Sequence, residues 1–390
     1  MMKYKKSIPS LLGAAALTLM FAACAKPKPE PTLKEALNGK FLIGCAINES
    51  QIRETDVKGD SVLLRHFNAI EPENCLKSQE IMPRFGEYDW ELADKYVAFG
   101  EKHGLDVFGH CLIWHSQCTP DFCYDNEGNL ISADELKARM KQHITTLMSR
   151  YKGRIKGWDV VNEAIMEDGS YRNSPFYQIL GEEFIPWAFK CASEADPDCE
   201  LYYNDYSMNE PAKVETVIRM VKAMKERGIR IDAVGFQAHI GMDYPDLDLY
   251  QQHIRRMSDE AGVGVCITEL DMSILPSITQ SADLGAVSFE ELMNNPELRA
   301  QFEERMNPYK ESVPQDVQDA WNNRFGEVMA MFIRNSDVIR RVNVWGLCDE
   351  DSWKNGWPIP GRTDYPLFVD RNYNLKPFAQ KIAEGPAAQE

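Results

Sequence analysis

Eight short hydrophobic runs, separated by longer amphipathic stretches, constrain the fold of this 390-residue chain more than any other feature. Most of the runs are apolar nearly throughout, which is typical of parallel strands covered by helices. The runs are residues 41–48, 67–71, 106–114, 155–162, 199–205, 233–240, 264–270 and 341–348. Eight strands interleaved with helices predict an α/β fold with one domain, the (β/α)8 TIM barrel, which takes about 250 residues plus insertions.

The stretches between the runs carry helix signals. Segment 90–103 keeps apolar residues at helical spacing, and Gly104 follows it as a C-terminal stop. Ser132 begins a capping-box pattern, Ser-Ala-Asp-Glu, which predicts a helix to about residue 151. Segment 211–227 ends at a glycine in the same way as the first. A doubly wound open sheet is the alternative that these patterns leave open.

A long connection follows the seventh run. We expect the barrel to occupy residues 39–385, with an insertion at about 276–314 that holds a helical segment near 289–306. Connections after barrel strands lie on the functional face. The insertion therefore either covers part of the site or is a surface excursion with its own helix.

The N-terminus has the pattern of an export signal. Three lysines precede a short apolar stretch that ends in small residues, so residues 1–23 are predicted to be a signal peptide of the lipoprotein type. The stretch is short for a spanning helix, which needs about 20 apolar residues. Cys24 directly follows and is the predicted lipidation site; a plain secretory signal is the alternative. Residues 24–38, rich in proline, then form a tether. We expect a membrane-anchored lipoprotein at the outer membrane or cell surface, or on the periplasmic side.

The net charge and the cysteine content argue against several kinds of partner and site. Lys and Arg number 43 against 60 Asp and Glu, a net charge of −17, which disfavours nucleic acid and anionic membrane surfaces as partners. Nine cysteines remain after Cys24, an odd number that cannot pair completely, and a domain of this size needs no disulfides. Histidines and cysteines in residues 110–123 match no zinc spacing. No metal and no cofactor is expected.

Six of the runs deliver polar side chains at their C-terminal ends. In each case Asn, Gln, His or a carboxylate follows apolar residues, at 109–117, 158–164, 202–206, 235–239, 267–271 and 345–349. The C-terminal ends of barrel strands meet at one face, where active sites of this fold lie. The pattern predicts a polar pocket there.

Glu163 and Glu269, from the fourth and seventh runs, are the candidate reacting pair. Cleavage of a glycosidic bond needs one carboxyl group to protonate the leaving oxygen and another to meet the oxocarbenium-like centre. Asn162 precedes Glu163 and could bind a sugar 2-hydroxyl, a contact that strengthens in the transition state. Aromatic side chains could contact sugar rings, with one adding a hydroxyl: Trp114, Trp345, Trp353 and Tyr203.

Several motifs extend this pattern. They are Glu73-Asn74 with Lys77, Gly109-His110 through Trp114-His115-Ser116-Gln117, Trp158 through Ala164, Gln237-Ala238-His239, Ile267 through Asp271, and Trp345-Gly346 with Asp349 and Ser352-Trp353. With them the chain resembles glycoside hydrolase family 10, the retaining endo-β-1,4-xylanases with a (β/α)8 barrel. The resemblance covers most of residues 40–385. It departs at Ser78, where the family usually has Trp, and in the acidic run 349–351.

The resemblance implies a role for each matching residue. Glu163 would be the general acid/base and Glu269 the nucleophile, with His239 holding Glu269 and Asn162 binding the 2-hydroxyl. The glycone side would be lined by Glu73, Asn74, Lys77, His110, Trp114, Gln117 and Gln237, with Trp345 and Trp353 closing over it. Retention predicts carboxyl groups about 5–5.5 Å apart.

These observations predict a monomeric retaining endo-β-1,4-xylanase that acts on xylan and xylo-oligosaccharides by double displacement. Two alternatives remain at this point. One is a non-catalytic xylan-binding lipoprotein, and the other is a related barrel glycosidase acting on β-1,4-glucan.

Overall fold

The computed structural model describes residues 2, 30–276, 294–300, 307–357 and 361–385. The chain divides into residues 1–30 and 31–390, and the fold described below is that of the second unit. Cys24, all of the predicted signal peptide except Met2, and most of the 276–314 insertion lie outside the described residues. Within these ranges, none of the helices has the length and hydropathy to cross a membrane.

The hydrophobic runs form a closed parallel sheet. Its strands are β1 (Leu42–Ile47), β2 (Ala69–Pro72), β3 (Asp106–Gly109), β5 (Gly157–Asn162), β6 (Glu200–Asp205), β7 (Ala233–Phe236), β9 (Gly264–Ser273) and β10 (Ile339–Val344). Each strand pairs with the next in parallel, and β10 pairs with β1. This closure confirms the eight-stranded TIM barrel in one domain over the open sheet.

Two predicted strands are interrupted near their C-terminal ends. Run 106–114 yields β3 and then β4 (Ile113–Trp114), which pairs with β5. Run 233–240 yields β7 and then β8 (His239–Gly241), which pairs with β9. Between β7 and β8, Ala238 has a φ of +62°, which breaks the extended backbone. The chain thus leaves the regular sheet where it carries polar side chains.

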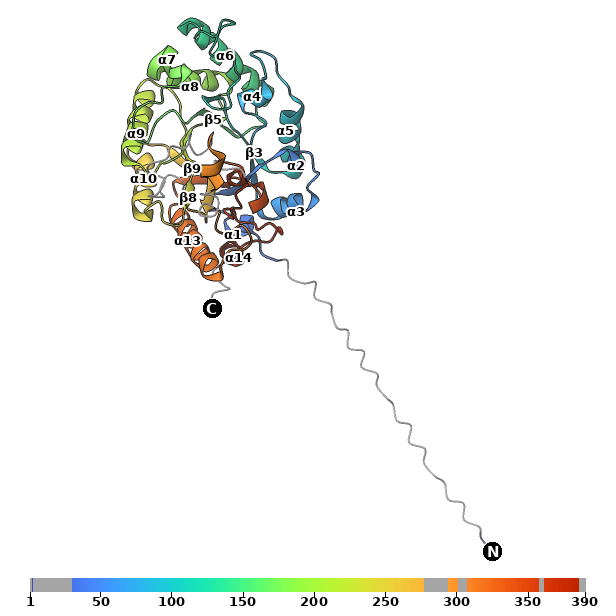
Figure 1. Cartoon of the computed structure of the whole chain (residues 1–390). Helices are drawn as coiled ribbons and strands as arrows, with labels where there is room; N and C mark the ends of the chain where they lie inside the picture. The colour runs from blue at the N-terminus through green and yellow to red at the C-terminus, as the bar shows by residue number, and fades with distance from the viewer. Residues whose placement is uncertain (1, 3–29, 277–293, 301–306, 358–360, 386–390) are drawn as a thin grey trace. The chain divides into compact units, whose positions relative to one another are not determined.

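Helices surround the strands on the outside (Figure 1). They are α1 (Leu33–Ala36), α2 (Glu49–Ile52), α3 (Val57–His66), α4 (Ser78–Ile81), α5 (Glu91–His103), α6 (Ala133–Arg150), α7 (Pro175–Leu180), α8 (Phe184–Ala195), α9 (Pro211–Glu226), α10 (Leu247–Asp259), α13 (Gln315–Arg334) and α14 (Pro377–Glu384). Helices α5, α6 and α9 confirm the three predicted from sequence. Ser132 caps α6 by accepting a hydrogen bond from the Glu135 backbone at 3.2 Å, and Gly104 ends α5 with φ +66°.

The tether is shorter than predicted. Residues 24–38 were expected to lie outside the barrel, but Leu33 and Leu37 are buried in the core. Helix α1 packs against α14 and β1. Thr32 caps α1 with its side chain. The folded domain therefore begins at about residue 32, and the two apolar residues that the tether prediction overlooked are the reason.

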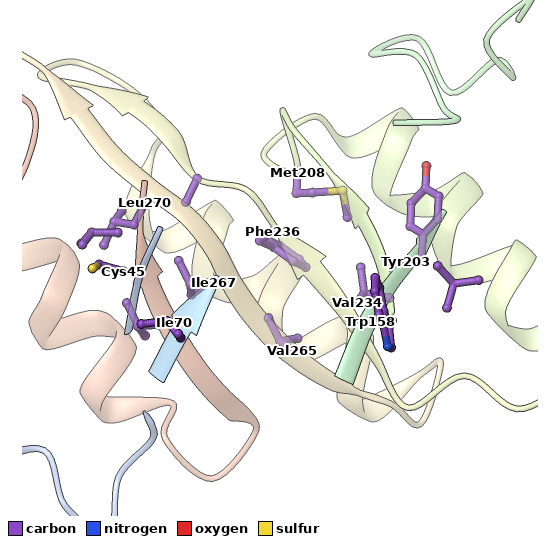
Figure 2. Packing of buried hydrophobic residues seen from close by; sticks show 14 of the residues in the cluster. Cys45, Ile70, Trp158, Tyr203, Met208, Val234, Phe236, Val265, Ile267 and Leu270 are labelled. Carbon is purple, nitrogen blue, oxygen red and sulfur yellow. The ribbon is translucent and has the colours of Figure 1, made fainter. Parts of the chain in front are cut away.

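The core has a shell between strands and helices, part of which is shown in Figure 2, and a smaller layer inside the barrel. Phe108 and Tyr202 belong to the inner layer. Arg341 shares this space: its side chain is 1% exposed, and its guanidinium lies 4.1 Å from the Phe108 ring centroid. Glu71 accepts from Arg341 at 2.6 and 3.3 Å, so the buried charge is paired.

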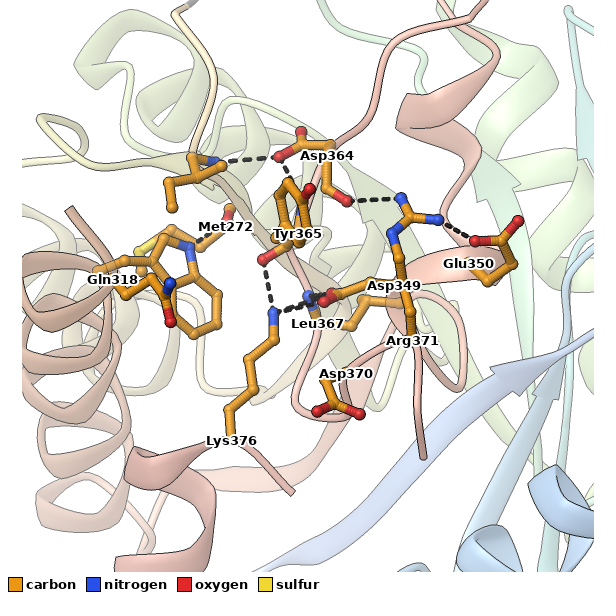
Figure 3. Close-up of polar contacts among 12 residues, drawn as sticks. Met272, Gln318, Asp349, Glu350, Asp364, Tyr365, Leu367, Asp370, Arg371 and Lys376 are labelled. Carbon is orange, nitrogen blue, oxygen red and sulfur yellow. Dashed lines mark hydrogen bonds and ion pairs between the residues drawn. The ribbon is translucent and has the colours of Figure 1, made fainter. Parts of the chain in front are cut away.

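A polar network holds the segment after β10 (Figure 3). Lys376 donates to Asp349 at 2.9 Å and to the Tyr365 carbonyl at 2.7 Å. Arg371 donates to the Asp364 carbonyl at 3.0 Å and pairs with Glu350. These bonds fix the segment that carries Trp353 over the C-terminal ends of the strands.

Candidate active site

A cavity of about 680 Å³ lies at the C-terminal ends of the strands. It brings together thirteen of the fourteen predicted catalytic, supporting and substrate-binding residues. They are Glu73, Asn74, Lys77, His110, Trp114, Gln117, Asn162, Glu163, Gln237, His239, Glu269, Trp345 and Trp353. Ser116, Tyr206, Ser207 and Trp357 complete the lining. The convergence predicted from the strand ends is therefore present.

Glu163 follows β5 and has a φ of +56°. Its Oε2 accepts a hydrogen bond from Trp114 Nε1 at 2.9 Å, and its Oε1 accepts one from Gln237 Nε2 at 3.0 Å. Burial raises the pKa of Glu163 above its usual range, and the negative charges of Asp205 and Glu269 add to the rise, while the two donors oppose it. A carboxyl group in this environment is suited to hold a proton and give it away.

Glu269, on β9, meets the opposite environment. Although burial raises its pKa, hydrogen bonds and positive charge outweigh burial, and the pKa of Glu269 lies below its usual value. Asn204 Nδ2 donates to Glu269 Oε1 at 2.7 Å, and His239 Nε2 lies 3.2 Å from Oε2. An ionised carboxylate at this position is suited to act as a nucleophile.

Asp271 orients His239 through the ring nitrogen that does not contact Glu269. Its Oδ2 lies 2.9 Å from His239 Nδ1 and also accepts from Trp353 Nε1 at 2.9 Å. Burial lowers the pKa of His239, but Asp271 and Glu269 raise it more, to about 9. His239 is therefore protonated near neutral pH, and its charge helps to keep Glu269 ionised.

A chain of amide hydrogen bonds joins the two carboxyl groups. Gln237 Nε2 donates to Glu163 and, at 3.2 Å, to Asn162 Oδ1. Asn204 Nδ2 donates to the same Asn162 oxygen at 3.1 Å and to Glu269. The chain fixes the positions of both glutamates. Asn162 Nδ2 is buried and has no partner among the described residues, so it is free to donate to a substrate hydroxyl.

One wall of the cavity is organised around Lys77. Its Nζ donates to Asn74 Oδ1 at 3.0 Å and to Gln117 Oε1 at 2.8 Å, and lies 5.2 Å from the Trp114 ring centroid. His110 projects from the end of β3, where its Nδ1 lies 2.9 Å from Asp159 Oδ2. The His110 ring packs edge-on against Trp345 with 5.2 Å between centroids. Polar groups and aromatic rings thus share this wall.

The placement of Tyr203 was wrong. It was expected to offer its hydroxyl to substrate, but the side chain is fully buried, and the hydroxyl bonds Asp205 and accepts from the Ala164 backbone at 3.2 Å. Tyr206 lines the cavity instead. Because side chains alternate along β6, Tyr203 and Asp205 lie on the opposite face from Asn204. That alternation was the available signal for Asn204, which sequence reasoning missed.

Glu71, His110 and Asp159 lie close enough to one another to share a metal ion. Arg341 already occupies the acidic side of this cluster, with Nη1 at 2.6 Å from Glu71 and Nη2 at 3.9 Å from Asp159. A guanidinium has five donors and no acceptor, so Arg341 neutralises these carboxylates in the place that a metal cation would take. The cluster fits a buried ion-pair network, not a metal centre.

Comparisons with known proteins agree with this geometry. The model of glycosyl hydrolase family 10 matches residues 32–385. The chain is 42% identical over 364 residues to endo-1,4-beta-xylanase A of Xylanibacter ruminicola, covering 93% of this chain and 96% of that protein. It is 35% identical over 356 residues to an endo-1,4-beta-xylanase of Geobacillus stearothermophilus, covering 90% and 98%.

Solved structures give the same result. A family 10 endoxylanase retrieved from a sugarcane soil metagenome superposes with a TM-score of 0.81 at 38% identity, covering 91% of this chain and 99% of that one. A family 10 structure from Paenibacillus barcinonensis has the same TM-score at 30% identity, covering 92% and 98%. Fold, site and sequence agree, and the chain belongs to glycosyl hydrolase family 10.

Proposed function

We propose that the chain is a retaining endo-β-1,4-xylanase that hydrolyses internal bonds of xylan by double displacement. One observation carries the proposal: two glutamates in one cavity have pKa values shifted in opposite directions, that of Glu163 upward and that of Glu269 downward. This is the pairing that acid-assisted glycoside cleavage requires. The xylanase relatives support xylan as the substrate.

In the first step, protonated Glu163 gives its proton to the glycosidic oxygen while the Glu269 carboxylate attacks the anomeric carbon. The C–O bond to the leaving sugar breaks, and an ester between Glu269 and the glycone sugar forms. In the second step, Glu163 takes a proton from water, whose oxygen attacks the same carbon and releases Glu269. Asn162 Nδ2 is available to donate to the sugar 2-hydroxyl in both steps.

The test compares Glu269→Ala and Glu163→Ala with wild type on xylan and on an aryl xylobioside. On xylan, we expect either variant to lose at least about a thousandfold in kcat. On an aryl glycoside with an acidic leaving group, Glu163→Ala should retain the first step and accumulate the glycosyl-enzyme, because the leaving group needs no proton. Xylan hydrolysis by Glu269→Ala at the wild-type rate would overturn the assignment.

Two rival functions have their own readouts. A non-catalytic xylan-binding protein would bind xylan without releasing reducing ends. A β-1,4-glucan hydrolase would cleave β-glucan faster than xylan. We expect wild type to release reducing ends and to prefer xylan, because the relatives that the chain matches over most of its length are xylanases.

We further propose that the chain is exported as a monomeric lipoprotein, with Cys24 acylated and residues 24–31 as the link to the domain. The positive start, the short apolar stretch and the small residues before Cys24 support this. A labelled fatty acid should be incorporated into wild type and not into Cys24→Ala, and wild type should partition with membranes. Equal labelling of both proteins would contradict lipidation at Cys24.

A further inference from the structure

The backbone turns sharply just after β5, at the residue that carries the acid/base carboxyl. Glu163 has a φ of +56°. Residues other than glycine rarely adopt this conformation, and it persists only where the surrounding structure holds it. The direction in which the Glu163 side chain enters the cavity therefore depends on the groups that hold its backbone.

Strand β6 holds the N–H groups of this turn. The Glu163 N–H donates to the Asn204 carbonyl at 2.9 Å. The Ala164 N–H donates to the Tyr203 hydroxyl at 3.2 Å. These two bonds tie one side of the turn to the barrel, and they leave its carbonyl groups to be held from elsewhere.

Arg172 holds the carbonyl groups of the same turn. It follows the loop of residues 165–171, whose ends are joined by an antiparallel bridge. Its Nε donates to the Glu163 carbonyl at 2.9 Å, and its backbone N–H donates to the Ala164 carbonyl at 2.8 Å. Its Nη2 donates to the hydroxyl of Tyr206, which lines the cavity. One side chain thus connects the backbone of the acid/base residue to a wall of the cavity.

The environment of Arg172 differs from that of an arginine in a surface ion pair. The side chain is half-buried and does not line the cavity. No carboxylate among the described residues forms an ion pair with it, and its donors are directed to a carbonyl and a hydroxyl oxygen. A guanidinium is planar and keeps its donors in fixed directions. Arg172 can therefore affect the reaction only through Glu163 and Tyr206.

We propose that Arg172 is a positioning residue for proton transfer by Glu163. It holds the carbonyl side of the left-handed turn and thereby keeps the Glu163 carboxyl directed at the glycosidic oxygen. The inference rests on the proposed xylanase function and adds a residue to its first step. Glu269 lies on β9 and is held by Asn204 and His239, so its attack on the anomeric carbon should not need Arg172.

The test measures kcat/KM on a series of aryl β-xylobiosides whose leaving phenols differ in acidity. This ratio reports the first step, in which a strongly acidic phenol such as dinitrophenol leaves without a proton and a weakly acidic phenol needs one. In Arg172→Met, kcat/KM for the weakly acidic phenol should fall about tenfold to a hundredfold, because a small displacement of the acid is enough for such a loss. For dinitrophenol it should change by less than about twofold, since Glu269 keeps its place.

Two further variants give the scale of the effect. Glu163→Ala removes the acid itself and should depend on the acidity of the phenol more steeply still. Arg219→Met removes an exposed arginine of α9 that lies outside the cavity, and it should keep the wild-type dependence. If Arg172 served folding alone, its loss would lower the rates on all phenols by the same factor. The dependence on leaving-group acidity therefore separates positioning from stability.

Arg172→Lys serves if Arg172→Met does not fold, because it keeps a cation without the planar set of donors. Its loss on the weakly acidic phenol should exceed its loss on dinitrophenol by at least about threefold. Equal changes on all phenols, in whichever of the two variants folds, would overturn the role of Arg172. A wild-type dependence in Glu163→Ala would instead overturn the assignment of the acid in the proposed function.

Discussion

Glu163 and Glu269 show how neighbours decide what one type of side chain does. Both are buried, and burial alone raises the pKa of each. Glu269 also faces protonated His239 and the amide of Asn204, so its charged form is favoured. Glu163 has only neutral donors, Trp114 and Gln237, and burial prevails. Activity should therefore fall at low pH as Glu269 gains a proton and at high pH as Glu163 loses one.

Trp114→Phe should move the alkaline limb of kcat/KM to higher pH. The indole donates to the charged form of Glu163, so its loss raises the pKa of that carboxyl further. A hydrogen bond to a charged group corresponds to about one pH unit. The pH profile of kcat/KM measures the shift. Trp90→Phe, outside the cavity, is the control, and an alkaline limb that stays in place would contradict the assignment of Glu163.

For single site residues, the sequence predicted correctly which strand ends contribute to the cavity. It did not predict which face of a strand a given side chain lies on. Asn162 and Glu269 line the cavity because parallel strands deliver their last side chains to one face. Glu73, Lys77 and Trp353, in contrast, lie beyond the strands and were predicted through the resemblance to the family. The prediction for Tyr203 was wrong because adjacent side chains on β6 point to opposite faces of the sheet, so Tyr203 and Asn204 lie on different faces. The run Tyr202–Asp205 is polar on both faces, so the sequence does not show which face lies inside the barrel. Tyr206 lies past the strand, where alternation gives no guidance.

Among the elements, β3 and β5 pack closer than most side chains allow. A Cβ at Gly109 would lie 2.2 Å from the ring of Trp158, whereas one at Gly326, in α13, would meet nothing within 4 Å. We expect Gly109→Ala to destabilise the fold by about 1–3 kcal/mol through overpacking. Gly326→Ala should stabilise it by up to about 1 kcal/mol, because it removes a helical glycine. Denaturant unfolding measures both, and equal effects would contradict the close approach.

Arg341 links β10 to β2 through Glu71, and its removal should cost stability in a pH-dependent way. Burial raises the pKa of Glu71 to about 7 even with Arg341 present. Without that cation the folded pKa rises further. Wild type and variant then differ in protonation only above about pH 7, where Glu71 is ionised in wild type, so the loss relative to wild type grows as pH rises above about 7. Arg341→Met should cost about 3–5 kcal/mol at pH 8 and less at pH 5.

Adding Glu71→Gln to Arg341→Met should recover part of that loss at pH 8, because no unpaired charge then remains at position 71. Thermal unfolding at the two pH values distinguishes the variants. A loss of the same size at both pH values would show that packing against Phe108, rather than charge, holds Arg341 in place.

The strands and long helices were predicted from their hydrophobic patterns, and the prediction failed where an element is too short to show a pattern. All eight barrel strands and three long helices were found from their runs. The interruption at Ala238 was not, since nothing in an apolar run marks a change in φ. Helix α1 was missed because four residues carry little periodicity and adjoin a proline-rich stretch.

For the whole molecule, stability should not depend on disulfides. Nine cysteines are free, and all but half-buried Cys118 are buried; Cys24 lies outside the described residues. The midpoint of thermal unfolding should be the same with and without reductant, whereas one disulfide would contribute about 2–4 kcal/mol. Thiol labelling of the native protein should be slow and confined to Cys118, because burial raises the pKa of that thiol to about 11. A reductant-dependent midpoint would contradict this.

The strands follow one another around the barrel in the order in which they occur in the chain. Helix α1, at the start of the domain, packs against α14, at its end. Because β10 already pairs with β1, a short peptide joining Gly385 to Thr32 would close the backbone without altering any strand pair. The exposed turn at 125–129 could then be cut to give new ends. In such a circular permutant both glutamates would keep their places, since the barrel wall, rather than the position of the first residue, sets the distance between them.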